Sequence, residues 1–144
     1  MPLNRSKVSI TSDEPGFGEL EAMLGEARSA FVDWARRALE NVKAPASELG
    51  SEDYAKARDE VFAVFHDLKG AGGGVGMELM SEIGASGCAF LRAYEQPNEY
   101  AVKVAKAHIA AAEGVLAADI RGDGGEAGRA LAAKLRAYAE RLSH

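Results

Sequence analysis

The sequence predicts an all-α protein, folded as an antiparallel four-helix bundle with one additional helix. The chain of 144 residues is rich in Ala, Leu, Glu and Arg, has few runs of β-branched residues and holds only 4 prolines, a composition that favours helices. Apolar residues recur at helical spacing in five segments. The connections between these segments are short, which favours antiparallel neighbours.

The length indicates a single domain. We expect residues 1–13 to form an N-terminal arm and residues 14–144 to form one helical domain. The first helix is predicted over 16–43, and Ala44-Pro45-Ala46 is expected to end it. Its apolar positions are Leu20, Leu24, Ala27, Phe31, Trp34, Ala38 and Val42. Trp34 is the only tryptophan, and we interpret it as a core or helix-packing residue.

The second helix is predicted from about Ser51 to a point between Gly72 and Gly76. At about 100° per residue, one apolar stripe lies opposite His66. The stripe comprises Ala57, Val61, Val64, Leu68, Ala71 and Val75. The outward face around the histidine carries Asp59, Phe62, Ala63, Lys69, Gly70 and Gly73.

The third helix is predicted over 77–95. Gly84 and Gly87 lie on it, and we expect them to let it approach a neighbouring helix closely. Cys88 sits among apolar positions, which favours a buried structural thiol over a nucleophile.

Two more helices complete the bundle. The fourth is predicted over 99–120 with Asn98 as its N-cap, and the fifth over 126–142. His108 lies beside the apolar stripe of the fourth helix, so we interpret it as a histidine at the surface boundary of the bundle.

Composition and charge argue against several classes of protein. The net charge is −5 and there is no basic cluster, so nucleic-acid binding is not expected. No apolar run reaches the length of a membrane span and no apolar signal core follows the N-terminal residues, so no membrane association is expected. The single cysteine fits a reducing compartment. We therefore expect a cytoplasmic protein.

Five of the seven residues from Gly70 to Gly76 are glycine. Each glycine inside a helix costs up to about 1 kcal/mol relative to alanine. A frayed helix end with Gly74 or Gly76 as its cap is one interpretation, which leaves His66 an ordinary surface histidine. It explains Gly70 and Gly73 poorly, because the apolar stripe continues past them. A bare surface that admits a bulky group to His66 is the other interpretation.

His66-Asp67-Leu68-Lys69-Gly70, followed by five residues and Gly76, resembles the H-x-L-K-G-x5-G pattern of histidine-containing phosphotransfer (HPt) domains. The run Gly72-Gly73-Gly74 departs from the small Ala, Ser or Asn residues that are more frequent there. The resemblance implies a phosphorelay protein in which phosphorylated His66 carries a phosphoryl group between receiver-domain aspartates. Lys69 would offset the phosphate charge.

The resemblance also implies the partners. Response-regulator receiver domains and a hybrid or sensor histidine kinase would dock on a patch that includes Phe62, Ala63, Gly70 and Gly73. The magnesium ion would sit on the receiver, so this chain would need no cofactor and no metal of its own. It would be a phosphotransfer intermediate rather than an enzyme, and we expect a monomer.

An HPt-like binding module remains an alternative, with a histidine that is never phosphorylated and a receiver or kinase that it sequesters. Other phosphate and metal motifs do not fit. A Walker A loop needs its lysine after the glycines, and here Lys69 precedes them. Cys88, His66 and His108 are too isolated in sequence to suggest a zinc site.

Overall fold

The computed structural model describes residues 16–93 and 95–141; the predicted arm, residues 1–13, lies outside the described residues. The described residues are helical and include no strand. The helices are α1 (Phe17–Ser47), the short 3-10 helix η2 (Glu48–Gly50), α2 (Tyr54–Gly74), α3 (Glu78–Arg92), α4 (Glu99–Ala117) and α5 (Gly125–Glu140). The all-α prediction is confirmed.

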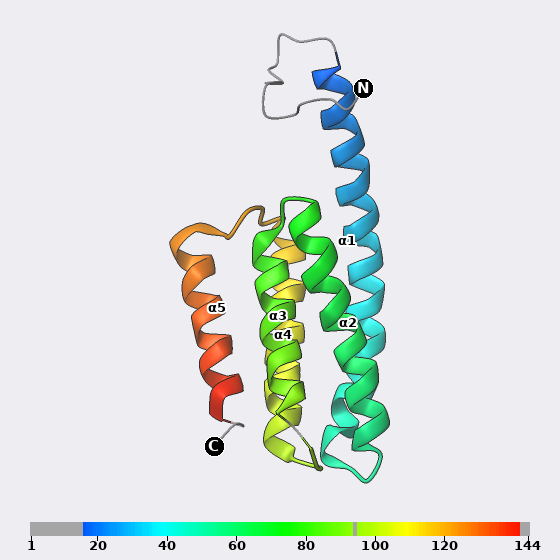
Figure 1. Cartoon of the computed structure of the whole chain (residues 1–144), viewed down its shortest axis with the longest axis vertical. Coiled ribbons are helices and arrows are strands. Elements are labelled where there is room, and N and C mark those ends of the chain that lie inside the picture. Colours follow the sequence, from blue (N-terminus) through cyan, green and yellow to red (C-terminus); the bar gives the residue numbers. More distant parts are fainter. Residues whose placement is uncertain (1–15, 94, 142–144) are drawn as a thin grey trace, which may run out of the picture.

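Helices α1, α2, α3 and α4 form a closed antiparallel bundle. Each of them contacts the next, and α1 also contacts α4, so that the ring closes. The α2–α3 contact is the most extensive. Helix α5 packs on α3 and, over a smaller contact, on α4, and Figure 1 shows it on the side of α3 away from α2. This is the predicted bundle with an additional helix.

The end of α1 differs from the prediction. Pro45 was expected to break the helix, yet α1 continues through it to Ser47. Proline removes one backbone donor, and here that loss falls in the last turn of the helix. Ala46 and Leu49, on either side of the helix end, are fully buried. Burial of these residues therefore holds the chain in helical form past the proline.

Helix α2 ends in a Schellman motif. The Met77 N–H donates to the Gly72 carbonyl oxygen at 2.9 Å, and the Gly76 N–H donates to the Gly73 carbonyl oxygen at 3.3 Å. Gly76 has φ of 76°, the left-handed conformation that this motif requires. The cap predicted at Gly74 or Gly76 is therefore at Gly76. Helix α2 begins at Tyr54, after the predicted cap Ser51.

The buried stripe of α2 is rotated relative to the prediction. Phe65 and Gly72 are buried, whereas Ala71 is exposed and Val64 is only half-buried. The cause is the close approach of α3. The Phe65 ring packs against Gly87, a residue of α3 that has no side chain. A Cβ atom at Gly87 would lie 2.5 Å from the Phe65 ring.

The close approach predicted for the third helix is confirmed at Gly84 as well. A Cβ atom there would lie 2.5 Å from the Phe65 carbonyl oxygen and 2.6 Å from the Lys69 backbone nitrogen. The backbone of α3 thus lies directly against the turn of α2 that carries His66.

The prediction for His108 is wrong. It is fully buried rather than at the surface boundary. Its Nδ1 lies 2.7 Å from the Val104 carbonyl oxygen and its Nε2 lies 2.8 Å from Ser86 Oγ. The rings of Phe65 and Phe90 flank it, with centroids at 5.8 Å and 5.4 Å. Because both ring nitrogens have partners, the core accommodates a polar side chain.

The remaining helices follow the prediction, except that two of them end earlier and α5 begins one residue earlier, at Gly125. Helix α3 ends at Arg92 rather than residue 95, and α4 ends at Ala117 rather than residue 120. The predicted end of the fifth helix, residue 142, lies outside the described residues. Asn98 caps α4 as predicted, because its side-chain oxygen accepts a 2.8 Å hydrogen bond from the Tyr100 N–H.

Two features of the surface bear on interactions. Leu20 and Leu24, predicted on the apolar stripe of the first helix, are exposed. In the part of the chain that the structure describes, no helix combines the length and the apolar character needed to cross a membrane.

Candidate functional site

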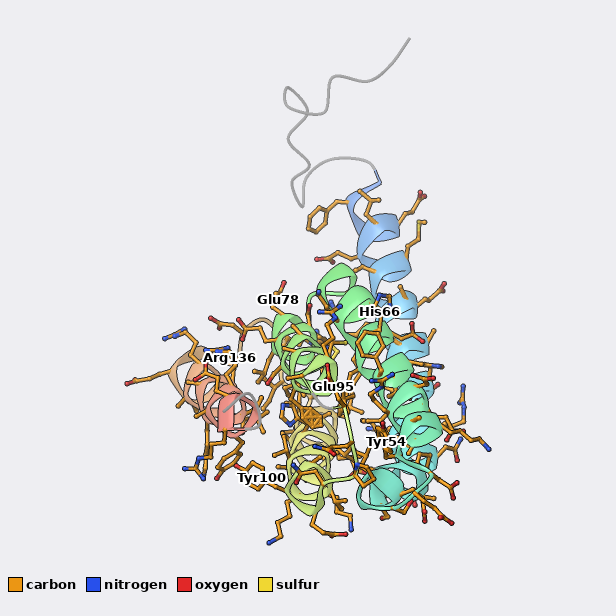
Figure 2. The ribbon with its side chains drawn as sticks, turned by 60° about the horizontal axis from the view of Figure 1, so that its bottom comes forward. Tyr54, His66, Glu78, Glu95, Tyr100 and Arg136 are labelled. Atoms are coloured by element: carbon orange, nitrogen blue, oxygen red, sulfur yellow. The ribbon has the colours of Figure 1, made fainter. Side chains whose placement is uncertain are left out.

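His66 lies on the outer face of α2. Its side chain is 64% exposed, and Figure 2 places it on the flank of the bundle near α1. Its Nδ1 is 3.8 Å from Asp67 Oδ1. The two side chains form an ion pair only when the imidazole is protonated. The outward orientation expected from the helical pattern is therefore observed, and His66 is open to a large reactant.

Helix α1 forms one wall of the site. Trp34 lines an open depression of about 280 Å³ together with His66, Asp67, Gly70 and Ala71. Trp34 also packs within its own helix, with its ring centroid 6.0 Å from that of Phe31. It is only half-buried. Trp34 packs against the core, as predicted, and its partly exposed side chain also lines the depression at His66, which the pattern of α1 alone does not indicate.

Helix α3 contributes to the opposite wall. The Phe62 ring stacks with the His66 ring, with centroids 6.0 Å apart and planes inclined by 25°. The Arg92 guanidinium lies 5.3 Å from the Phe62 centroid, within cation–π range. Arg92 is not predictable from the sequence, because a contact between two helices leaves no signal in the local pattern of either one.

Lys69 lies one turn after His66 and is exposed. Within residues 16–93 and 95–141 it forms no ion pair. An ammonium group without a carboxylate partner is available for an incoming anion. The Lys69 backbone packs against Gly84 of α3, and Arg92 belongs to α3 itself, so both residues are on the α3 side of the site.

The glycine surface next to His66 is open. Among the described residues, a Cβ atom at Gly70 would meet nothing within 4 Å, and one at Gly73 would meet only Ser81 Oγ, at 3.9 Å. Gly70, Gly73 and Ala63 are exposed on the same face as the histidine. The structure therefore brings together the residues predicted for the site: His66, Lys69, Phe62, Ala63, Gly70 and Gly73.

The backbone behind the site is held by α3. Ser81 Oγ donates a 2.7 Å hydrogen bond to the Lys69 carbonyl oxygen. This bond and the close packing at Gly84 fix the turn of α2 between His66 and Gly70. This support from α3 helps to hold the exposed His66 side chain in position.

Cys88 of α3 lies in the core and not on the surface of the site. It is buried, as predicted, and burial raises the pKa of its thiol, while Arg92 and Lys69 act in the opposite direction. A thiol kept protonated by burial is a poor nucleophile.

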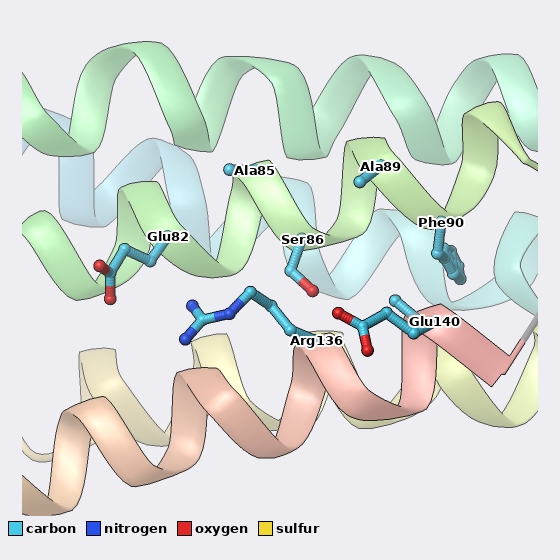
Figure 3. Close-up of a pocket in the computed structure, with 8 residues that line it drawn as sticks. Glu82, Ala85, Ser86, Ala89, Phe90, Arg136 and Glu140 are labelled. Carbon is cyan, nitrogen blue, oxygen red and sulfur yellow. The ribbon is translucent and has the colours of Figure 1, made fainter. Parts of the chain in front are cut away.

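A second groove lies between α3 and α5, well away from His66. Its volume is about 270 Å³, and Glu82 and Ser86 of α3 face Arg136 and Glu140 of α5 across it, as Figure 3 shows. Figure 2 shows Arg136 and His66 on opposite flanks of the bundle. Among the described residues, no three His, Cys, Asp or Glu side chains gather as a metal site.

Comparisons of the chain with protein-family models, with curated proteins and with solved structures found no match. The resemblance to HPt domains therefore rests on the His66–Gly76 motif. The surroundings of His66 are the physical basis on which a function can be argued.

Proposed function

We propose that this chain is a histidine phosphotransfer protein that carries a phosphoryl group on His66 between aspartates of partner receiver domains. The observation that supports this most directly is the exposed His66 imidazole beside an open glycine surface and the Lys69 ammonium, which has no ion-pair partner among the described residues. Of the two histidines in the described part of the chain, His108 is buried and His66 is exposed.

The chemistry is nucleophilic attack by a neutral imidazole. Because the Asp67 carboxylate lies near Nδ1, we assign Nε2 as the nucleophile and Nδ1 as the nitrogen that keeps the proton. The Nε2 lone pair forms a bond to phosphorus, the acyl phosphate P–O bond breaks, and the partner aspartate leaves as a carboxylate. The ring then carries a positive charge, which the Asp67 carboxylate offsets. The reverse sequence transfers the group to the next aspartate.

Lys69 and the glycine surface have separate roles. Phosphoryl transfer depends mainly on positioning and on neutralising charge. The Lys69 ammonium supplies positive charge one helical turn from the histidine, and the open surface at Gly70 admits the partner aspartate with its phosphoryl group. The chain needs no ATP site of its own, because the partner supplies the activated phosphate and the magnesium ion.

The test is phosphate transfer from a panel of phosphorylated receiver domains to the purified chain. His66→Gln is the test variant. His144→Gln is the matched control, since the chain has 3 histidines and this change removes one to which the proposal gives no role. We expect an acid-labile, base-stable phosphate on the wild type and on His144→Gln, and none on His66→Gln.

Two other results would overturn the proposal in different ways. Binding of a receiver without any transfer would indicate an HPt-like binding module whose histidine is not phosphorylated. Label that persists in His66→Gln would place the phosphate on another residue.

A further inference from the structure

The N-terminal turns of α1 lie beyond the end of the bundle. The Arg28 Nε donates a 3.1 Å hydrogen bond to the Val75 carbonyl oxygen, so Arg28 is level with the C-terminal end of α2. Residues 17–27 precede this level, and at about 1.5 Å per residue they extend roughly 16 Å further. Figure 1 shows this end of α1 projecting past the other helices.

The projecting turns carry an exposed apolar surface. Leu20 is 46% exposed, Met23 is 65% exposed and Leu24 is 43% exposed. Across residues 16–93 and 95–141 these are the large hydrophobic side chains that count as exposed. A contiguous exposed apolar patch on an otherwise ordinary surface marks an interaction site.

This surface is continuous with the α1 wall of the His66 depression. Counting back from Trp34 in steps of four and three residues keeps to one side of the helix. The positions reached are Ala30, Ala27, Met23 and Leu20. We call these residues, together with Trp34, the α1 strip. Because Trp34 lines the depression beside His66, the strip leads from the site onto the projecting turns.

The length of the strip suits a protein partner seated on His66. An interface of standard size covers about 800 Å² on each partner, which is roughly 30 Å across. Met23 precedes Trp34 by 11 positions, or about 17 Å along the helix axis. A partner that covers both His66 and Trp34 therefore reaches the outer part of the strip.

The charge along the strip indicates what kind of surface faces it. Glu19 and Glu26 lie four residues before and three residues after Met23, so they border the strip on one side. Two copies of the strip packed together would bring these carboxylates close to one another. A partner whose apolar patch is edged by Lys or Arg would meet them favourably.

Resting on the proposed function, we propose that the α1 strip is part of the docking surface for the receiver domain. It contacts an apolar patch with a basic edge, next to the phosphorylated aspartate of that partner. The depression at His66 receives the phosphoryl group, and the projecting turns of α1 enlarge the interface and select the partner.

The experiment compares Met23→Glu with Ala22→Glu in the full chain. The two changes add the same charge to the same exposed turn, but Ala22 lies about 100° around the helix from Met23, outside the strip. Three quantities are measured for each chain: the Kd for an unphosphorylated receiver from the panel, the rate of transfer from the same receiver when phosphorylated, and labelling of His66 by phosphoramidate, a small phosphoryl donor.

We expect Met23→Glu to raise the Kd for the receiver about tenfold, the equivalent of roughly 1.4 kcal/mol of binding free energy. The transfer rate at subsaturating receiver should fall in proportion. Ala22→Glu should stay within about twofold of the wild type on the same scale. Labelling by phosphoramidate should be unchanged in both, because the small donor does not touch the strip.

Other results overturn the inference, and they can be told apart from a failure of the proposed function. Normal transfer with equal Kd values for both variants would remove the strip from the interface while leaving His66 as the phosphoacceptor. A wild-type dimer in sedimentation that Met23→Glu dissociates would assign the strip to a second copy of this chain. Receiver binding that is weakened by Met23→Glu, without transfer to any chain, would keep the strip and refute the phosphotransfer.

Discussion

Phe65 and His66 are neighbours in sequence, but their side chains enter opposite environments. The Phe65 ring is fully buried against Gly87 of α3, whereas the His66 side chain is 64% exposed. Adjacent residues on a helix are about 100° apart, so the packing of Phe65 fixes the rotation of α2 and with it the direction of His66. Stability of the core and orientation of the candidate site are therefore linked.

Gly84→Ala should destabilise the fold. The new Cβ atom would lie 2.5 Å from the Phe65 carbonyl oxygen and 2.6 Å from the Lys69 nitrogen. Both are backbone atoms, so neither can move aside as a flexible side chain would. We expect the free energy of unfolding to fall by about 1–3 kcal/mol, the usual cost of overpacking, in urea denaturation.

Gly114→Ala is the matched control for this change. Gly114 lies inside α4, and a Cβ atom there would meet no atom of residues 16–93 or 95–141 within 4 Å. Helix propensity alone should then stabilise the protein by up to about 1 kcal/mol. If both variants shifted stability in the same direction by the same amount, the close α2–α3 contact would not be the cause.

Much of the fold follows from patterns within single helices. Five apolar periodicities and the Asn98 cap were sufficient to predict five helices and their antiparallel order. Pro45 misled the prediction because burial of Ala46 and Leu49 outweighs the loss of one hydrogen bond in a last turn. That burial depends on which helices pack against the end of α1, and it cannot be predicted from the pattern of a single helix.

The candidate site likewise has a part that could be predicted from one helix and a part that could not. His66, Lys69 and the glycines share one helix, so their spacing was sufficient to place them on one face. Trp34 and Arg92 come from α1 and α3, and only the packing of three helices brings Trp34 beside the histidine and Arg92 onto the Phe62 ring. His108 was assigned to the surface because its partner Ser86 lies on another helix and could not be anticipated.

The stability of the protein should decrease as the pH falls below about 6.5. Burial lowers the pKa of His108 from its ordinary value near 6.5, while the Val104 carbonyl acts in the opposite direction. The unfolded chain therefore binds a proton at a pH where the folded chain does not, and protonation favours unfolding. At a pH well above 6.5 both states are neutral at this position, so the contribution of His108 is constant there.

Urea denaturation from pH 5 to pH 7.5 checks this, with His108→Gln as the comparison. The variant loses packing and should be less stable at pH 7.5. Its free energy of unfolding should nevertheless change less between pH 6.5 and pH 5 than that of the wild type. Parallel curves over this range would show that the pH dependence arises from other groups.

Lys69→Gln should slow phosphotransfer without destabilising the fold. Lys69 is exposed and forms no ion pair within the described residues, so its charge contributes little to stability. Beside a transferring phosphoryl group the same charge acts on the transition state, and we expect the transfer rate to fall about tenfold, or roughly 1.4 kcal/mol.

Lys56→Gln removes a lysine from the same helix two to three turns before His66, where its side chain is 83% exposed. It should leave the transfer rate within about twofold of the wild type. Equal rates for the two variants would mean that general surface charge, and not the position of Lys69, assists the reaction.

Gly70 separates the requirement for space from the requirement for stability. In the part of the chain that the structure describes, a Cβ atom at this position meets nothing within 4 Å, so Gly70→Ala should stabilise α2 by up to about 1 kcal/mol. Gly70→Leu should fold equally well, yet its side chain would occupy the open surface beside His66 and slow transfer from a receiver domain. Phosphoramidate labelling should change much less, since a small donor approaches from more directions.

Gly74→Leu, at another open position of α2, serves as the control. Wild-type transfer by Gly70→Leu would show that the bare surface is not needed to admit the partner.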